Sequence, residues 1–299
     1  MNHLPRPEGP TAEDFKVSRR ALGGLFFSGY AVAALAAEAQ PVTTSDDGLV
    51  IDEIEIPNGE PKPLPAYVAR PKDKAKAPAV IVVSEIFGVH DYIKDVCRRW
   101  ARQGYVAIAP AFFHRAGDPA GLTDFDEILK IVATARHPQV MGDVTTTLSW
   151  LKQQSFVRDG KHGITGFCWG GTVVWMSAAR HPEIGAGAAF YGRLVAPPPP
   201  EPGQPPRGEP DRPYPVDIAG DLHAPVLGLY AGKDRGIPLE SVEQMRAALK
   251  AAGKTDSEIV VYPDAQHGFH ADYRPSYDAA AAADAWKRAT AWFEHHLKG

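Results

Sequence analysis

A lone cysteine between glycines is the residue of this sequence best suited to covalent chemistry. Cys168 stands in the run Gly166-Phe167-Cys168-Trp169-Gly170-Gly171, where an apolar segment that predicts a strand meets one that predicts a helix. A nucleophile on such a strained strand-to-helix turn needs small neighbours, so that strand and helix can pass closely. Burial as an inert core cysteine is the alternative, but it does not account for glycines on both sides.

Two residues further along the chain can activate this thiol. A thiol is a poor nucleophile until it is deprotonated; His267 can take its proton, and Asp234 can hold the opposite ring N–H. The order Cys168, Asp234, His267 is the nucleophile, acid and histidine order of the α/β-hydrolases. His270 and His295 are rivals for the histidine, and the position directly after the last predicted strand favours His267.

Alternating strands and helices must bring these residues together. A hairpin is predicted from residues 49–56 and 66–69, followed by strands at 79–83, 105–109, 163–166, 187–191, 226–230 and 259–262. Helices are predicted at 91–103, 122–135, 140–154, 172–179, 239–252 and 278–297. This alternation predicts an α/β fold with one doubly wound, mostly parallel sheet and helices on both faces. Sites in such sheets gather where strands end, which is where the candidate residues fall.

Composition and charge narrow the class of partner. The chain has 299 residues, 44% of them hydrophobic and 23% charged, with a formal net charge of −4. There is no basic stripe that would favour nucleic acid or an anionic membrane surface. The two cysteines, Cys97 and Cys168, form no C-x-x-C pair, so neither a disulfide framework nor a zinc site is predicted. We expect a small-molecule substrate and neither a cofactor nor a metal ion.

The first forty residues are typical of a targeting segment. Ser18-Arg19-Arg20 precedes an uncharged run over 21–37 and then Ala37-Glu38-Ala39, which resembles a twin-arginine export signal with a cleavage site. This predicts a signal at residues 1–40, a folded domain at 41–299, use of export machinery and a periplasmic or exported protein. An uncleaved N-terminal helix or anchor, and with it a cytoplasmic location, is the alternative.

A proline-rich stretch interrupts the predicted domain at residues 196–215. Its prolines exclude regular helix and sheet, and a loop of this length within a compact domain is usually functional. We therefore expect a surface insertion near the site.

The motifs together resemble the dienelactone hydrolases, or carboxymethylenebutenolidases, over residues 49–297. The resemblance rests on Glu85-Ile86-Phe87-Gly88, the elbow at 166–171, Tyr191-Gly192, Asp234 and His267-Gly268-Phe269. It implies the α/β-hydrolase fold, opening of an unsaturated lactone by thiol attack, and a triad of Cys168, Asp234 and His267. It also implies that Glu85 meets the thiol in the resting enzyme and helps to generate the thiolate when substrate binds.

The resemblance further implies which groups surround the substrate. Backbone N–H groups of Ile86 and Trp169 are expected to form the oxyanion hole. The aromatic side chains expected to line the pocket are Phe87, Tyr191 and Phe269.

The family's substrate-binding arginine after the catalytic histidine is displaced in this sequence. His267 is followed by Gly268-Phe269-His270-Ala271-Asp272-Tyr273-Arg274. Arg274, Arg115 or His270 is therefore the candidate that binds the substrate's anionic group. The departure leaves the native substrate open.

The predicted activity is hydrolysis of dienelactone-like lactones or activated esters through a cysteinyl acyl-enzyme. A general carboxylesterase or thioesterase on the same triad is the first alternative. The second is a non-catalytic protein of the same fold whose Cys168 senses oxidants.

Overall fold

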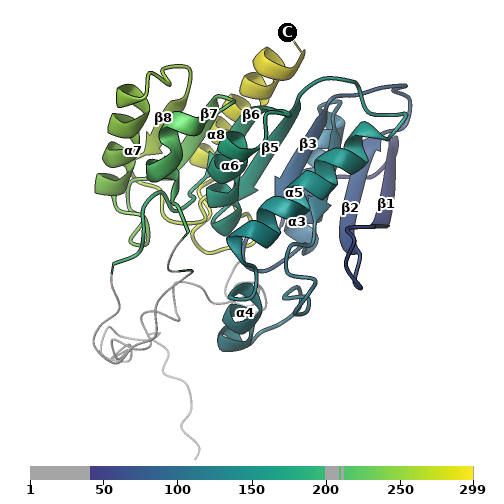
Figure 1. Cartoon of the computed structure of the whole chain (residues 1–299), viewed down its shortest axis with the longest axis horizontal. Helices are drawn as coiled ribbons and strands as arrows, with labels where there is room; N and C mark the ends of the chain where they lie inside the picture. Colours follow the sequence, from purple (N-terminus) through teal and green to yellow (C-terminus); the bar gives the residue numbers. More distant parts are fainter. Residues whose placement is uncertain (1–40, 199–208, 210–211, 299) are drawn as a thin grey trace, which may run out of the picture.

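An eight-stranded sheet is the frame of the molecule (Figure 1). The computed structural model describes residues 41–198, 209 and 212–298. The strands are β1 (Leu49–Ile56), β2 (Leu64–Pro71), β3 (Ala79–Val83), β4 (Val106–Pro110), β5 (His162–Phe167), β6 (Ile184–Phe190), β7 (Val226–Ala231) and β8 (Glu258–Tyr262). Their order is β1-β2-β4-β3-β5-β6-β7-β8, with β2 antiparallel to its two neighbours and all later pairs parallel. This confirms the mostly parallel sheet and its edge hairpin.

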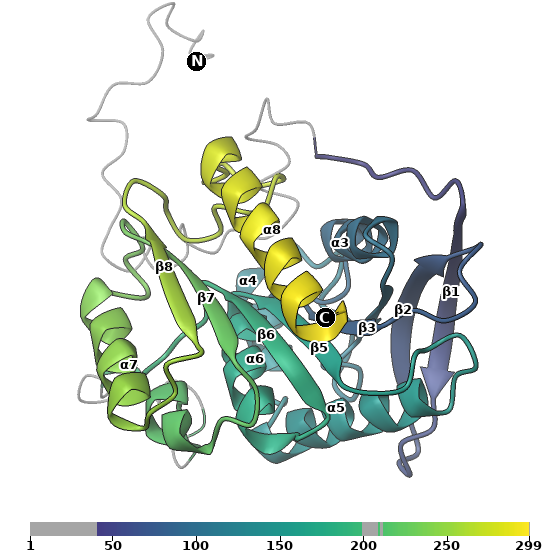
Figure 2. The same ribbon diagram turned by 90° about the horizontal axis from the view of Figure 1, so that it is seen from above.

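Helices cover both faces of the sheet. They are α3 (Asp91–Arg102), α4 (Phe125–Val132), α5 (His137–Lys152), α6 (Trp169–Arg180), α7 (Leu239–Ala251) and α8 (Ala279–Phe293), with a 3₁₀ helix at Pro215–Asp221 and a π turn at Glu294–Lys298. Figure 2 shows α3 and α8 on one face and α5, α6 and α7 on the other. The doubly wound architecture predicted from the sequence is thereby confirmed.

The core lies between the central strands and the helices that flank them. All five residues of β3 are buried, as expected for a strand covered on both faces, which reads as a continuous apolar run. Strand β1 at the sheet edge keeps all three of its acidic side chains exposed, and such charges oppose pairing with another strand. Because the central strands are buried on both faces, they hold the loops that follow them in fixed positions.

Several predicted boundaries shift. Helix α4 spans Phe125–Val132 instead of 122–135, because the carboxylate of Asp124 accepts the N–H groups of Asp126 and Glu127 and starts the helix there. The terminal helix likewise begins after Asp278, which caps it, and α8 ends at Phe293.

Two predicted segments lie wholly or mostly outside the described residues. These are the signal at 1–40 and the central part of the proline-rich insertion at 196–215. Among the residues that the structure does describe, no helix has the length and apolarity needed to cross a membrane.

Candidate active site

Cys168 is the single residue between β5 and α6, at the carboxyl end of a parallel strand. Its φ of +55° is in the left-handed region, which is uncommon for a residue with a side chain and marks a strained turn. The Cys168 N–H donates to the carbonyl of Phe190 at 3.0 Å, which ties the turn to β6. The side chain stays partly exposed, so the structure places this cysteine on a turn of the predicted kind.

Two glycines let the strand and the helix pass each other at this turn. A Cβ on Gly166 would lie 2.4 Å from the carbonyl oxygen of Gly170, and a Cβ on Gly170 would lie 2.5 Å from the carbonyl oxygen of Val83. Both distances are far inside van der Waals contact, and the opposing atoms are backbone. A side chain at either position would push α6 away from β3 and β5 and displace Cys168.

Asp234 and His267 meet across the loops that follow β7 and β8. Nδ1 of His267 lies 2.6 Å from Oδ2 of Asp234, while Oδ1 accepts the N–H groups of Gly236 and Ile237 at 2.8 and 3.0 Å. The two backbone groups therefore fix the carboxylate in the orientation that meets the imidazole. The carboxylate is 1% exposed and the imidazole 16% exposed, so the pair is closed on the acid side and open on the other.

The thiol of Cys168 is the second partner of His267. Burial alone would lower the pKa of His267, but the negative charge of Cys168 and the hydrogen bonds to Asp234 and Cys168 raise it well above its ordinary value of 6.5. A raised imidazole pKa favours the imidazolium, which in turn stabilises a thiolate beside it. The structure thus brings together the three side chains predicted as a triad.

Glu85 is fully buried just after β3, and three side chains other than the thiol hold its carboxylate. Oε2 accepts a hydrogen bond from the Tyr273 hydroxyl and lies 3.6 Å from Nε2 of His90, while Oε1 lies 3.8 Å from Nη1 of Arg274. Burial alone would raise the pKa of Glu85, but Arg274 and His90 lower it to about 2. The resemblance implied a contact between Glu85 and the thiol; the structure directs this carboxylate to Arg274 instead.

Arg274 is at the site but is already paired. Its side chain is 6% exposed, and its guanidinium lies 5.2 Å from the centre of the Phe87 ring. The Phe87 side chain is buried under this guanidinium, so it does not line an open pocket as expected. Burial opposes the charge on Arg274, whereas Glu85, Tyr273 and Cys168 raise its pKa. Arg274 therefore supplies a fixed positive charge near the thiol, and the ion pair with Glu85 competes with any anion that it could bind.

The backbone N–H groups of Trp169 and Ile86 are the predicted oxyanion donors. Trp169 is the first residue of α6, where an N–H has no partner within the helix. Ile86 follows β3, which pairs with β5 as far as Val83 and Gly166. In the part of the chain that the structure describes, neither N–H donates to an acceptor. Both remain able to bind a developing oxyanion.

An apolar cluster next to the elbow is separate from the main core. It contains Ile86, Phe87 and Ile128 of α4, and Trp169 packs against both this cluster and the core. The Trp169 ring also lies 4.9 Å from the ring of Phe113, centre to centre. Helix α4 and the residues around it thereby form an apolar wall beside the predicted oxyanion donors.

Tyr191 and Phe269 lie behind His267. The Tyr191 ring centre is 5.1 Å from that of His267 and 5.3 Å from that of Phe269. Both aromatic side chains are fully buried, and Phe269 also packs on Tyr262, with the ring centres 5.0 Å apart. This corrects the expectation that they line the substrate pocket: Tyr191 packs against the imidazole of His267, and Phe269 packs against Tyr191.

Arg115 is the predicted substrate-binding residue that the structure places in another set of contacts. Its Nη1 and Nη2 donate to Asp143 at 2.8 Å each, and Nε and Nη2 donate to Glu60 at 2.7 and 2.8 Å. These four hydrogen bonds use four of the five N–H donors of the guanidinium, and the two carboxylates already balance its charge. The expectation for Arg115 is therefore wrong in this structure.

Two partners of Glu85 were not predicted from the sequence, and His270 lies in other surroundings than expected. Tyr273 and His90 hold the carboxylate, although nothing in their sequence neighbourhoods indicates it. Nδ1 of His270 lies 2.6 Å from the Tyr92 hydroxyl, and burial lowers the pKa of His270 to about 3. A neutral, buried imidazole does not bind anions, so His270 is excluded from that role.

Among residues 41–198, 209 and 212–298, no three His, Cys, Asp or Glu side chains converge in a way that could hold a metal ion.

Comparison with known proteins assigns the family. The family model described as "Dienelactone hydrolase family" matches residues 64–297. A protein of Escherichia coli strain K12 with the provisional name carboxymethylenebutenolidase is 46% identical over 275 residues, which are 90% of this chain and 96% of that protein. A Bradyrhizobium protein, provisionally named a 2-oxo-3-(5-oxofuran-2-ylidene)propanoate lactonase, is 32% identical and spans 84% of this chain and 96% of its own.

A solved structure supports the same assignment. The crystal structure of a protein from Klebsiella pneumoniae subsp. pneumoniae, provisionally named a dienelactone hydrolase, superposes with a TM-score of 0.74 at 46% identity. It covers 82% of this chain and 98% of its own. The chain therefore belongs to the dienelactone hydrolase family and is a hydrolase of the carboxymethylenebutenolidase-like type with the α/β-hydrolase fold.

Proposed function

We propose that the protein hydrolyses lactones or activated esters through a thioester formed on Cys168. The observation that carries this proposal is the continuous connection from the thiol through His267 to the buried carboxylate of Asp234. The provisional lactonase name of the Bradyrhizobium relative supports the substrate class.

The first half-reaction opens the ring or releases the alcohol. The Cys168 thiolate attacks the carbonyl carbon, and the carbon–oxygen double bond becomes a tetrahedral oxyanion. When the oxyanion collapses, the bond from the acyl carbon to the ring or alcohol oxygen breaks. The imidazolium of His267 gives its proton to that leaving oxygen, so the products of this step are a thioester and a hydroxyl group.

Backbone donors stabilise the intermediate between these two events. The N–H group of Trp169 lies in the first turn of α6, and that of Ile86 lies in the turn that follows β3. Fixed donors that meet charge only as it develops lower the barrier without reorganisation. Arg274, held by Glu85, adds a fixed positive charge near the sulfur.

The second half-reaction restores the enzyme. His267, now neutral, takes a proton from a water molecule that attacks the thioester carbonyl. The bond from carbon to sulfur breaks, and the thiolate is regenerated beside the imidazolium. The hydrogen bond from Nδ1 of His267 to Asp234 keeps the imidazole in the same orientation in both half-reactions.

The assignment of the nucleophile is tested by trapping the acyl group. Incubation with an activated aryl ester should release a burst of the phenol and add one acyl mass to wild-type protein and to Cys97→Ala. Cys97 is the matched control because its thiol is fully buried in α3 and burial raises its pKa. Cys168→Ala should show neither burst nor adduct. Full turnover by Cys168→Ala would overturn the proposal.

The same three residues could also hydrolyse ordinary carboxylic esters or thioesters. A substrate panel distinguishes a lactonase from a carboxylesterase and from a thioesterase. Comparison of unsaturated lactones, alkyl esters and thioesters by kcat/KM ranks the classes. An oxidant sensor is separated from an enzyme by peroxide: rapid oxidation of Cys168 in a protein that cleaves no ester or lactone supports the sensor.

Export of the protein is a separate proposal, based only on the sequence of residues 1–40. We expect the full chain to reach the periplasm with its N-terminus starting after Ala39, and replacement of both arginines, Arg19→Lys and Arg20→Lys, to retain it in the cytoplasm. Cell fractionation and N-terminal sequencing measure both. An intact Met1 in the cytoplasm would overturn this proposal.

A further inference from the structure

The chain just before β1 lies along α3 and is held there by charged side chains. Thr44 donates its N–H to Oδ1 of Asp95 at 2.5 Å, and its carbonyl accepts a hydrogen bond from Nε of Arg98 at 2.9 Å. Figure 2 shows this segment, in purple, passing beside α3. Residues 42–45, the strap, are therefore bound to the helix through their backbone.

Asp95 connects the strap to the loop that carries His267. Its Oδ2 accepts a hydrogen bond from Nε of Arg99 at 2.6 Å, and Nη2 of the same guanidinium donates to Oδ2 of Asp272 at 2.5 Å. The two carboxylate side chains are each 3% exposed, and that of Arg99 is 17% exposed. Burial raises the pKa of Asp272, whereas Arg99 and the backbone of Val42 act to lower it. This guanidinium and its two carboxylates, the bridge, join α3 to the loop after β8.

The loop after β8 consists of tight turns, so its parts move together. The N–H of Ala271 donates to the carbonyl of Gly268, and the N–H of Arg274 donates to the carbonyl of Ala271, both at 2.9 Å. Gly268 directly follows His267 and has a φ of +78°, and a Cβ there would lie 2.6 Å from Nη1 of Arg274. Asp272 lies within the second of these turns. A displacement of Asp272 is therefore passed on to His267 and Arg274.

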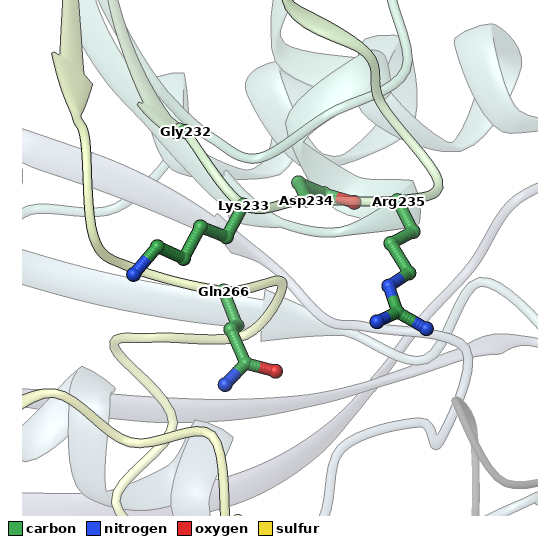
Figure 3. A pocket seen from close by; sticks show the side chains of 5 residues that line it. All are labelled: Gly232, Lys233, Asp234, Arg235 and Gln266. Atoms are coloured by element: carbon green, nitrogen blue, oxygen red, sulfur yellow. The ribbon is translucent and has the colours of Figure 1, made fainter.

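The beginning of the same loop is fixed separately. The N–H of Lys233 donates to the carbonyl of Ala265 at 2.9 Å. Figure 3 shows Gln266, the residue before His267, beside the loop that carries Asp234. The imidazole of His267 therefore lies between two anchors, of which one is the loop after β7 and the other is α3 with its bridge.

We propose that Asp272 is a positioning residue for His267 and Arg274, and that the strap keeps it in place through the bridge. This rests on the proposed function, because the positioned groups are those of the proposed reaction. A small misplacement of a reacting group lowers the rate steeply, and a buried ion pair is costly to break. The predicted cleavage after Ala39 leaves the strap on the mature chain.

Alkylation of Cys168 by iodoacetamide reports the position of His267 without any ester turnover. In wild type, the imidazolium beside the thiol favours the reactive thiolate. Arg99→Lys keeps the charge but cannot bridge both carboxylates, and Asp272→Asn removes the charge of one of them. Either change should lower the alkylation rate at neutral pH about tenfold. Wild-type alkylation rates in both variants, with circular dichroism showing that they are folded, would overturn the proposal.

Arg102→Lys is the matched control on the same helix. Arg102 lies further along α3 and donates to the carbonyl of Ser45 at 3.0 Å, outside the bridge. This variant should be alkylated at the wild-type rate. An equal decrease in Arg102→Lys and Arg99→Lys would show a general effect of charge on α3 and would exclude a specific role of the bridge.

Steady-state kinetics with an activated aryl ester measures the effect on turnover. Both bridge variants should reduce kcat by between about 10-fold and 100-fold with KM close to wild type, because the substrate still binds while the imidazole is misplaced. The double variant Arg99→Lys/Asp272→Asn should be no slower than the slower single variant, since both changes remove the same bridge. Lower stability with unchanged kcat and alkylation would mean a purely structural bridge and would overturn the proposal. Slower alkylation in a protein that cleaves no ester would support the positioning role and overturn the proposed function alone.

A proline substitution tests the contribution of the strap. Thr44→Pro removes the N–H that binds Asp95, so alkylation and turnover should slow by about threefold to tenfold. Thr43→Pro is the matched control, because in the part of the chain that the structure describes the N–H of Thr43 donates to no acceptor. Wild-type rates in Thr44→Pro, or equal effects of the two prolines, would overturn the role of the strap.

Discussion

The two charged pairs at the carboxyl edge of the sheet differ in their access to solvent. His267 and Asp234 open toward the partly exposed Cys168, whereas Glu85 and Arg274 are sealed, with side chains 0% and 6% exposed. A molecule bound at Cys168 can exchange a proton with His267. Glu85 and Arg274 are closed to such a molecule and keep their opposite charges. Both pairs join a carboxylate to a nitrogen base, so residue type alone does not distinguish them. Depth of burial and orientation decide which pair is able to exchange a proton and which pair holds a fixed charge.

The largest effect is expected at the open pair, from His267→Gln. Loss of the imidazole removes both the base that generates the thiolate and the acid for the leaving oxygen, so kcat/KM should fall about 10⁵-fold. Steady-state kinetics measures this. His270→Gln is the matched control, because His270 bonds Tyr92 and has no role in the proposed reaction. Comparable losses in the two folded variants would contradict the assignment of His267.

The next effect tests the orientation of that imidazole. Asp234→Asn keeps the size of the side chain but no longer stabilises the imidazolium, and kcat should fall about 10⁴-fold. Asp264→Asn, at an exposed acid nearby, should keep wild-type kcat. A decrease below tenfold for Asp234→Asn would mean that the 2.6 Å contact has no catalytic role.

The sealed pair should affect stability first. Arg274→Met leaves the carboxylate of Glu85 buried without its cation, and the free energy of unfolding should fall by about 3–5 kcal/mol at neutral pH. Urea unfolding followed by circular dichroism measures it. Adding Glu85→Gln to Arg274→Met should restore part of the loss. Additive losses from the two changes would show that the residues are not coupled.

The smallest effect is the pH dependence of the sealed pair. The pKa of Glu85 is about 2 in the folded protein, below its ordinary value of 4.5. The charged carboxylate therefore contributes stability that is present above about pH 4.5 and is lost as the pH falls toward 2. A few kcal/mol, on the order of 2–4, should disappear over that interval in wild type.

Glu85→Gln should lose less stability than wild type over the same interval, although it is less stable at neutral pH. Glu53→Gln is the control, since the Glu53 carboxylate is 70% exposed in its pair with Lys94. Equal slopes for wild type and Glu85→Gln would contradict a lowered pKa for this carboxyl group.

Residues at strand ends could be predicted from the sequence. The apolar runs before Cys168, Asp234 and His267 indicate buried parallel strands, and parallel strands end at one edge. The order of the three residues then suffices to bring them together. The glycines at 166 and 170 indicate a close approach of strand and helix, which the structure contains.

Contacts between distant loops could not be predicted. Tyr273 reaches Glu85 across 188 residues of sequence, and Arg115 pairs with Glu60 and Asp143 at separations of 55 and 28 residues. From the sequence alone, an arginine near a predicted site is a candidate for binding the substrate's anionic group. Only the structure shows which carboxylates it already binds. The burial of Tyr191 and Phe269 likewise depends on how the loops pack. The hydrophobic periodicity of the sequence predicts strands and helices but not the packing of loops.

The separation of the small apolar cluster around α4 from the main core has a consequence for protein engineering. Ile86, Phe87 and Ile128 form a group of their own, joined to the core through Trp169. A substitution in α4 changes contacts within this group only. The contacts between the central strands and their flanking helices stay the same, because the two sets of residues do not share partners other than Trp169. We expect that exchanging this segment for the same segment of another family member changes the apolar wall beside the proposed oxyanion donors and leaves the stability of the sheet unchanged.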